Sequence, residues 1–390
     1  MLELDAEFAF QPEEDAEFFP LLPELPAVCL IEPRQEKAEP HLIRTANLRR
    51  RLLRLLGPED PTSKRLNLRN FARQVRYRVT NSAFEQSLMY YRIAKQYFPT
   101  RYKSLMRLRP SPVLKINLKN AYPRCYVTRH ISVNEAGEPA GGIYYGPFAS
   151  RRAAQTYADS VLDFFKVRRC QIKIRRDPAF PGCMYSEMRM CLAPCFAGCT
   201  KEEYDSEVGR LVAFLETGGD SLHEAYEQER ERASGELDFE RAAALHKKLE
   251  KLDNVLRAGP EIARRIQDLH AVILQRMAEE QTIGIFGVRA GRLAEPFALR
   301  FGDTGQPRSA EETVRDYLET TMTAPPATKA IRQSSTELGE HLRLLARWFY
   351  SNPRQGEIFF REKDWPYRRI LRACARLLAR PKEETNEAKP

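Results

Sequence analysis

Residues 235–256 read GELDFERAAALHKKLEKLDNVL and carry the clearest periodicity in the chain. Apolar side chains recur here in alternating steps of three and four residues, which is the spacing of a helix face that packs against another helix. Asp238 is a suitable N-cap, because its carboxylate can accept a hydrogen bond from a free amide of the first turn. The whole of 201–258 is charged and helical in pattern, so the sequence predicts a helical hairpin with a coiled-coil seam. The apolar positions of the seam are Ala242, Leu245, Leu249, Leu252 and Leu256.

The beginning of this helix carries a narrow apolar seam that one hairpin cannot fully bury. Its residues are Leu237, Phe239 and Ala243, with Glu240 beside them. The pattern therefore predicts pairing with a hairpin of another protein. The alternative is packing inside the chain, against a complementary stripe formed by Tyr204, Val208, Leu211 and Leu215.

The composition is that of a folded protein with several modules. The chain has 390 residues, of which 43% are hydrophobic, and this length is enough for roughly two to four modules. No apolar run approaches the ~20 residues that span a bilayer. The first residues, MLELDAEFAFQPEEDAEFFP, are acidic where a signal peptide would be basic. We therefore expect a cytoplasmic protein with no membrane partner.

The order of the patterns predicts an α+β multidomain fold. A strand at 27–31, a helix ending at Gly57-Pro58, a strand at 72–80 and a helix ending before Pro99 predict a small α/β module. The expected divisions are a disordered acidic leader at 1–23, the small α/β module at 24–108, strands and a cysteine-rich region at 109–200, the helical region at 201–258, an α/β tail domain at 259–380 and a disordered tail at 381–390.

Positive charge is concentrated in one part of the chain. Residues 44–109 contain 17 lysines and arginines against three acidic residues, an excess larger than the net charge of +10 of the whole chain. A basic block interleaved with tyrosines is typical of a surface that binds a phosphate backbone. The alternative is a solvated, arginine-rich face. The candidate phosphate contacts are Arg44, Arg49, Arg51, Arg73 and Arg76, with Tyr77 as a stacking partner.

Five of the eight cysteines lie between Cys170 and Cys199. Four thiolates can hold an iron–sulfur cluster or one zinc ion, because both require four soft ligands. The spacing C-x12-C-x7-C-x3-C has longer loops than the C-x2-C knuckles of structural zinc. The alternative is a group of reduced, unliganded thiols. The isolated cysteines, which we expect to serve in packing, are Cys29, Cys125 and Cys374.

Three separate stretches resemble the UvrC family of bacterial nucleotide-excision-repair proteins. The first comprises 122–129, which contains YPR and TR, and YGPF at 145–148; the second is the cysteine run ending in Ala-Pro-Cys at 193–195. The third is LDFERAA at 237–243, which is similar to the UVR motif. The tail segments FGVRAGRLAEPF and LLARWFYSNP resemble the opening of the family's C-terminal endonuclease domain, and the chain ends before the catalytic motifs expected there.

The resemblance implies several functional assignments. It implies a [4Fe–4S] cluster, with zinc as the alternative, on Cys170, Cys183, Cys191 and Cys195, and leaves Cys199 unassigned. It implies a UvrB-like partner for the hairpin and DNA as the nucleic acid. The protein would then act in excision repair, with three alternatives for its chemistry: a protein whose nuclease site has degenerated, an active Cho-like endonuclease that incises damaged DNA, or a purely non-catalytic adaptor that binds DNA.

The same resemblance implies a degenerate GIY-YIG nuclease fold at 24–108. Its tyrosine positions correspond to Cys29 and His41, its arginine to Arg51 and its metal-binding glutamate to Tyr90. Without that carboxylate we expect no divalent metal at the nuclease site, so Arg51 and His41 remain as candidate catalytic residues. The run GIYYG at 142–146 only imitates the motif, because the two triplets of a GIY-YIG nuclease lie on separate strands.

Overall fold

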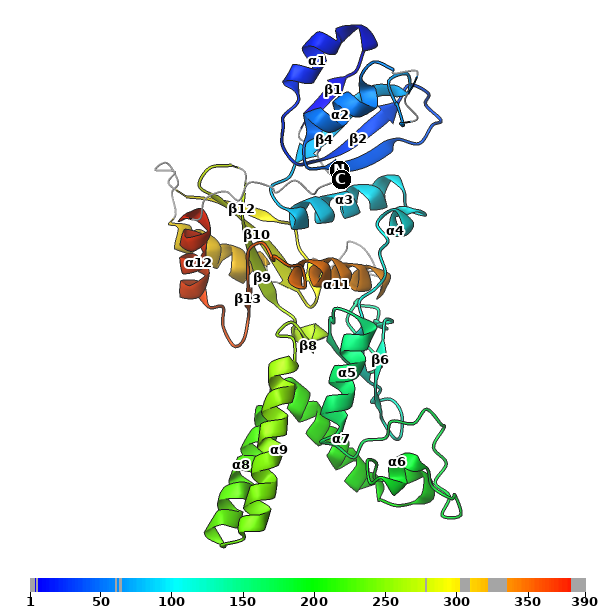
Figure 1. Cartoon of the computed structure of the whole chain (residues 1–390), viewed down its shortest axis with the longest axis vertical. Coiled ribbons are helices and arrows are strands. Elements are labelled where there is room, and N and C mark those ends of the chain that lie inside the picture. Colours follow the sequence, from blue (N-terminus) through cyan, green and yellow to red (C-terminus); the bar gives the residue numbers. More distant parts are fainter. Residues whose placement is uncertain are drawn as a thin grey trace.

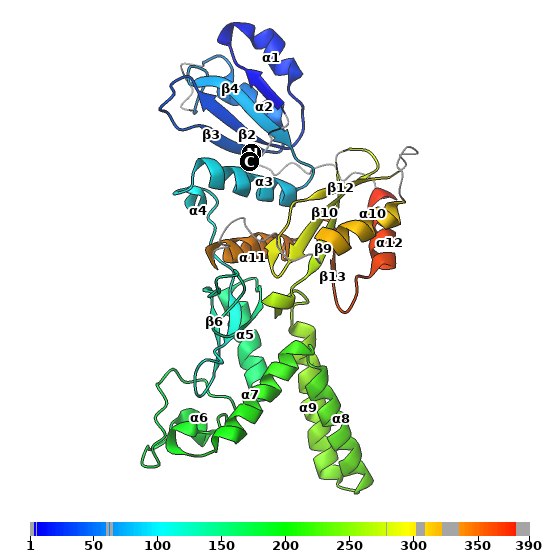
Figure 2. The same ribbon diagram turned by 180° about the vertical axis from the view of Figure 1, so that it is seen from behind.

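The structure is a computed structural model that describes residues 4, 6–59, 62, 65–277, 279–301, 309–321 and 335–379. An N-terminal module lies at one end of an elongated molecule, a C-terminal module lies beside it, and a middle module leads to a helical hairpin at the other end (Figures 1 and 2). The α+β character expected from the sequence is confirmed. The disordered tail expected at 381–390 lies outside the described residues.

The N-terminal module is an antiparallel sheet with helices on both faces. Its strands are β1 (Ala6–Ala9), β2 (Ala27–Pro33), β3 (His41–Thr45) and β4 (Ala72–Val79), in the order β1-β4-β2-β3. Successive side chains of a strand point to opposite faces. Cys29 and Ile31 accordingly pack with helix α2 (Leu48–Leu56), whereas Val28 and Leu30 pack with helix α3 (Ala83–Tyr97).

The expectation of a disordered leader is wrong for the residues that the structure describes. β1 pairs with β4, and the single turn η1 (Pro12–Glu14) leads into helix α1 (Asp15–Leu21). Phe10, Phe18, Phe19 and Leu22 are buried in the core formed with α2. The aromatic residues of this acidic segment therefore gain enough apolar contact to order it, which local periodicity does not reveal.

Local signals explain where the helices of this module begin and end. The side chains of Asn47 and Ser82 accept hydrogen bonds from amides in the first turns of α2 and α3. α2 ends before Gly57, and α3 ends shortly before Pro99, as predicted. The short helix α4 (Tyr102–Leu105) follows.

The middle module combines a sheet with two helices. Strands β5 (Val113–Ile116), β6 (Cys125–Thr128) and β7 (Ile143–Gly146) are joined by β8 (Arg264–Arg265), which returns after the hairpin. Helix α5 (Arg151–Leu162) covers the sheet, and the cysteine region contains only the short elements α6 (Met184–Glu187) and η2 (Pro194–Phe196) before helix α7 (Lys201–Glu216). The GIYYG run ends in β7, outside the N-terminal module.

The predicted helical hairpin is confirmed. Helices α8 (Asp220–Gly235) and α9 (Phe239–Ala258) lie side by side (Figures 1 and 2). The carboxylate of Asp238 accepts a hydrogen bond from the amide of Arg241, as expected of an N-cap. Leu245, Leu249 and Leu252 are buried in the seam.

The C-terminal module is a sheet between two helical layers. The strands of this sheet follow the order β11-β10-β9-β13, and β12 also pairs with β10. The strands are β9 (Ala271–Arg276), β10 (Thr282–Arg289), β11 (Arg292–Leu293), β12 (Phe297–Arg300) and β13 (Glu357–Phe360). The helical elements are η3 (Ile266–Asp268), α10 (Ala310–Asp316), the π-helical η4 (Tyr317–Thr321), α11 (Ser335–Phe349) and α12 (Tyr367–Ala379). α10 and α12 pack on one face of the sheet, and α11 packs on the other.

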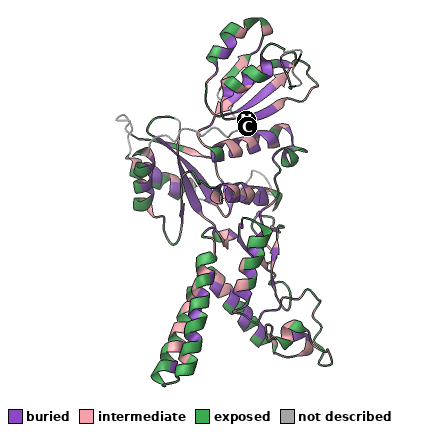
Figure 3. Cartoon of the chain, viewed as in Figure 1, coloured by how far each residue is buried: buried purple, intermediate pink, exposed green. Residues whose placement is uncertain are grey.

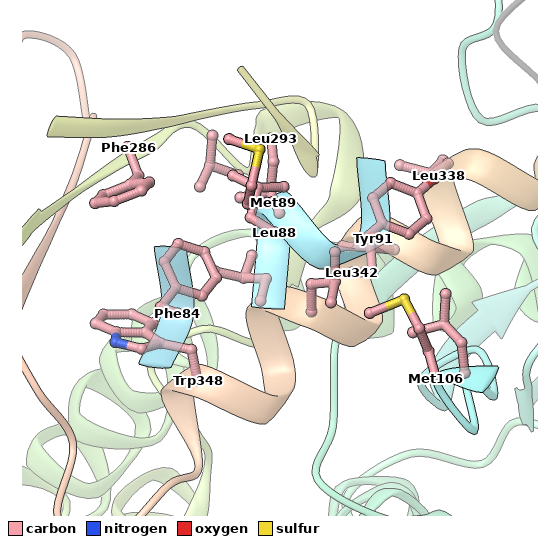
Figure 4. Close-up of a cluster of buried hydrophobic side chains, with 14 of the residues drawn as sticks. Phe84, Leu88, Met89, Tyr91, Met106, Phe286, Leu293, Leu338, Leu342 and Trp348 are labelled. Carbon is pink, nitrogen blue, oxygen red and sulfur yellow. The ribbon is translucent and has the colours of Figure 1, made fainter. Parts of the chain in front are cut away.

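Helix α3 joins the N-terminal and C-terminal modules through one continuous core. Phe84 lies 5.2 Å from Phe286 of β10 and 5.6 Å from Trp348 of α11, measured between ring centroids. Figure 4 shows further side chains of α3 and α11 packed together here, among them Leu88, Tyr91 and Leu342. Because the same core also contains Val28 and Leu30 of β2, α3 has apolar partners in both modules.

A buried carboxylate lies inside this junction. Glu340 of α11 is 1% exposed and accepts hydrogen bonds of 2.7 Å from the hydroxyls of Tyr91 and Tyr102. Lys103 lies 3.6 Å from the same carboxylate. A buried carboxylate is tolerated only when its charge is compensated and its oxygens are hydrogen-bonded. Both conditions are met only when α3 and α4 dock on α11.

We expect Glu340→Gln to destabilise the junction. The amide cannot accept from both tyrosine hydroxyls as the carboxylate does, and losing a hydrogen bond to a charged group costs about 1–3 kcal/mol. The matched control is Glu311→Gln, which removes an exposed carboxylate paired with Arg315 and should change stability by no more than about 0.5 kcal/mol. Urea unfolding followed by tryptophan fluorescence measures both. Equal midpoints for the two variants would contradict the assigned role of Glu340.

Candidate functional site

The structure separates the residues aligned with the nuclease motif. His41 lies near Arg51, and the pKa of His41 is lowered by burial and by the positive charge of that arginine. Tyr90 belongs to α3, on the other face of the sheet, where its ring lies 5.8 Å from the guanidinium carbon of Arg44. Side chains along β3 point alternately to the two faces of the sheet, so His41 and Arg44, three residues apart, lie on opposite faces. The two candidate catalytic residues therefore lie on the same side of the sheet and within electrostatic range of each other, whereas Tyr90, at the position of the glutamate, lies on the other side.

No carboxylate of α3 serves a metal at this place. Glu85 is buried at the beginning of the helix, and its carboxylate accepts hydrogen bonds from the amide and the side chain of Asn81 at 2.7 and 3.0 Å. It therefore stabilises the helix terminus. Across the described ranges, no three Cys, His, Asp or Glu side chains are grouped so that they could hold a metal ion.

Two of the predicted phosphate contacts are committed to the fold. Arg49 donates to the carbonyls of Leu22 and Pro20 at 2.7 and 2.9 Å and pairs with Glu24 at 2.6 Å. It thereby fastens the segment after α1 to α2. Arg76 pairs with Glu7 and Glu32, both at 3.3 Å. Neither guanidinium is free to bind a phosphate without breaking these contacts.

Two other arginines of the predicted set are exposed. Arg73 has 61% of its side chain exposed and pairs with Glu32 at 3.1 Å. Arg44 is exposed and packs over the ring of Tyr90. These two guanidinium groups are accessible from solvent, and only that of Arg73 faces a carboxylate.

The predicted stacking role of Tyr77 is wrong. Tyr77 is 6% exposed, and its ring is stacked on that of Phe8 with centroids 6.0 Å apart. The cause is β1, which pairs with β4 and covers this part of the sheet. A nucleic-acid base cannot reach the ring while β1 is in place.

The cysteine region gathers four thiols. Burial raises the pKa of Cys191 to about 11 together with the charges of Cys170, Cys195 and Cys183, against the opposing hydrogen bond from the amide of Ala193. Cys191 is thus within electrostatic range of the other three thiols. The four predicted ligands therefore share one region, although they are not grouped closely enough to form a ready metal site.

Cys199 differs in its packing from the other four cysteines of this region, although Cys195 is buried as well. It is buried, and its pKa is raised by burial and by Glu203, with opposition from Arg176. Arg176 also donates to its carbonyl at 3.0 Å. Cys199 packs in the apolar core of the middle module. Its surroundings favour a structural role.

The tip of the hairpin presents the predicted partner seam to solvent. Leu237 is 72% exposed and Phe239 is 67% exposed, and Glu240 and Ala243 are exposed as well. Much of the surface of the two helices is exposed in Figure 3. The alternative of internal packing is not met, because Tyr204, Val208 and Leu211 of α7 are buried in the core of the middle module.

The structure adds basic residues that the sequence did not single out. On α11, Arg343 lies near Arg129, which follows β6, and Arg347 lies near Arg44 of β3. Only the four-residue spacing of the α11 pair is visible in the sequence. The approach of the other two depends on how the three modules dock.

The fold carries a recognisable middle domain. Residues 111–214, which contain β5 to α7 and the cysteine region, match the model of the UvrC/Cho excinuclease middle domain. The chain is a UvrC-family protein. The resemblance found in the sequence is thus confirmed at the level of the family. No solved structure matches this UvrC-family chain.

Curated relatives extend the similarity beyond the middle domain. The UvrABC system protein C of Carboxydothermus hydrogenoformans is 30% identical over 296 residues, which cover 74% of this chain and 46% of the relative. That of Dehalococcoides mccartyi is 26% identical over 282 residues, covering 72% and 45%. That of Thermoanaerobacter sp. is 25% identical over 276 residues, covering 70% and 44%. This UvrC-family chain therefore spans less than half the length of these relatives.

The structure also bears on membrane association. No helix in the described parts of this UvrC-family chain is both long enough and apolar enough to cross a bilayer.

Proposed function

We propose that this protein acts in nucleotide excision repair as a DNA-binding protein that recruits a UvrB-like partner, and that its N-terminal module does not cut DNA. The observation that carries the proposal is the hairpin tip, where Leu237 and Phe239 of the UVR-like motif are exposed to solvent. Exposed apolar groups at the end of a charged hairpin are costly unless they bind a partner. The family of the chain supplies the context of repair.

The hairpin is suited to binding another helical hairpin. Asp238 and the ion pair between Arg241 and Glu229 hold the tip in a defined conformation. Leu237 adopts a left-handed backbone conformation, with φ of 60°, at the turn between the helices. Leu237 and Phe239 are thus presented on an ordered scaffold. A preorganised apolar anchor loses little conformational entropy when it binds.

We expect Phe239→Ala to weaken binding to purified UvrB by on the order of 10- to 100-fold, as for the truncation of a central aromatic anchor. The matched control is Leu53→Ala, which shortens an exposed apolar side chain on α2 in the N-terminal module. Isothermal titration calorimetry with the full chain measures the dissociation constants. If both variants bind UvrB as tightly as the unchanged protein, the hairpin is not the interface.

The proposal that the N-terminal module does not cleave DNA rests on a missing negative charge at the nuclease site. A GIY-YIG-type site needs a carboxylate to hold its divalent metal, and Tyr90 stands at that position. A tyrosine hydroxyl cannot supply the missing negative charge. The neighbouring Glu85 is already used at the helix terminus. An arginine and a neutral histidine remain, and these alone do not form a metal-dependent nuclease site.

One observation favours the second candidate function, an active Cho-like endonuclease. The lowered pKa of His41 keeps its imidazole neutral near pH 7 and therefore able to accept a proton, and Arg51 lies near it.

A nicking assay distinguishes the two candidate functions. Because the metal-binding carboxylate is missing, we expect no magnesium-dependent nicking of ultraviolet-damaged plasmid by the full chain, and no difference between it and Arg51→Ala. Nicking that disappears in Arg51→Ala would establish the endonuclease instead.

We further propose that Cys170, Cys183, Cys191 and Cys195 hold a [4Fe–4S] cluster. The donor set fits in its chemistry, because four soft thiolate ligands are what such a cluster requires. The raised pKa of Cys191 means that binding must displace a proton. The loops between the short elements α6 and η2 would have to draw the sulfurs together. When bound, the cluster would supply a rigid crosslink for a segment with little regular structure.

We expect anaerobically purified protein to be brown and to contain about four iron and four sulfide per chain. Cys191→Ser should lose the iron, whereas Cys374→Ser should retain it, since Cys374 is buried in the C-terminal module far along the chain. Metal analysis and the visible absorption spectrum measure the result. A colourless protein with one zinc per chain would support the zinc alternative.

A further inference from the structure

Four arginines from three modules approach one another where these modules meet. Arg44 lies on β3 of the N-terminal module, Arg129 follows β6 of the middle module, and Arg343 and Arg347 lie on α11 of the C-terminal module. The segments that carry them meet in one apolar core, which contains Leu42 of β3, Ile131 after β6 and Leu344 of α11. The pKa of Arg347 is lowered by burial and then by Arg343 and Arg44, and that of Arg343 by burial and then by Arg129.

The two arginines of α11 form the buried side of this cluster. Arg347 donates through one nitrogen, Nη2, to the carbonyls of Met106 and Arg107 at 3.1 and 2.8 Å, so its guanidinium is held in place by one of its three nitrogens. Arg343 is half-buried, and its Nε is inaccessible to solvent with no hydrogen-bond partner among the described residues. Arg44 and Arg129 are exposed at the rim.

The cluster has no compensating acid. Within the ranges that the structure describes, none of these four arginines forms an ion pair. The buried acid on the same helix, Glu340, does not compensate them, because its carboxylate accepts hydrogen bonds from tyrosines of α3 and α4. Like charges four residues apart on a helix destabilise it by a few tenths of a kcal/mol. A buried guanidinium nitrogen without a partner costs about 1–3 kcal/mol. The arrangement is thus unfavourable in the free protein, and an anion bound at the accessible guanidinium groups would relieve the repulsion among them.

The shape of the cluster favours a nucleic-acid backbone over a small anion. The four guanidinium groups come from three modules, so a polyanion is better suited than one compact ion to reach all of them. Arg44 also lies over the ring of Tyr90, an aromatic face beside the positive charge. Positive charge combined with an aromatic face is typical of surfaces that bind nucleic acids.

We propose that Arg44, Arg129, Arg343 and Arg347 bind the phosphodiester backbone of a nucleic acid across the junction of the three modules. This inference rests on the proposed DNA-binding function and locates it. The site differs from the surface expected on β4, where Arg76 is paired with acids and Tyr77 is buried. A bound strand would neutralise the cluster and would contact all three modules at once.

The test compares two double variants of the full chain. Arg129→Gln with Arg343→Gln removes one rim and one buried arginine of the cluster. The matched control, Arg54→Gln with Arg368→Gln, removes two exposed arginines from α2 and α12. Both variants have the same net charge. Binding of a fluorescein-labelled DNA duplex is followed by fluorescence anisotropy over a series of salt concentrations.

We expect the cluster variant to bind DNA on the order of tenfold more weakly than the control variant at moderate salt. Its plot of log affinity against log salt concentration should be shallower by about one to two units, because fewer phosphates are contacted. Its thermal midpoint should equal or exceed that of the unchanged protein, since repulsion and an unpaired buried nitrogen are removed. A purely structural role would lower that midpoint.

The outcomes separate this inference from the proposed function. If the unchanged protein binds no DNA, the proposed DNA-binding function fails and this site fails with it. If the unchanged protein binds DNA and the two double variants bind it equally, only this site is overturned. Polyglutamate that competes with DNA as effectively as unlabelled duplex would assign the cluster to an acidic polypeptide and overturn the nucleic-acid assignment.

Discussion

The docking of α3 between two modules is the constraint on which the upper half of the molecule depends. One side of the helix packs on Val28 and Leu30 of the N-terminal sheet, and another packs on Phe286 and Trp348 of the C-terminal module. The buried carboxylate of Glu340 on α11 fixes the relative position of the helices at this junction, because its two tyrosine donors come from α3 and α4. Apolar contact alone would permit sliding, whereas a buried charge requires its partners at fixed positions.

This junction explains the fate of the basic block. Several of its arginines, such as Arg49 and Arg76, form hydrogen bonds and ion pairs that hold the N-terminal module together. The proposed nucleic-acid contact instead uses arginines that the junction of the modules brings together. A surface of this kind depends on the docking of α11, and any change that loosens α3 from α11 would also separate Arg44 from Arg347. The structure thus couples the stability of the junction to the proposed DNA contact.

The lower half of the molecule is organised differently. The hairpin of α8 and α9 projects away from the modules and carries its apolar tip at the far end (Figure 1). The cysteine region lies in the middle module, with few hydrogen-bonded elements of its own. The proposed partner, cluster and nucleic-acid sites therefore occupy separate parts of the chain, so variants that impair one of them should leave the others intact.

The sequence by itself determined the helical hairpin, its Asp238 cap, the helices on either side of the N-terminal sheet, and the resemblance to the UvrC family, because these features depend on local periodicity, capping and motif spacing. It could not show that β1 and α1 are ordered, since Phe10 and Leu22 are buried by contacts with distant residues. For the same reason it placed Tyr77 on the surface, where β1 covers it. Only the tertiary structure decided which arginines form ion pairs and which lie together without an acidic partner. Ion pairing between modules depends on how the modules dock, and residues close in the sequence do not determine it.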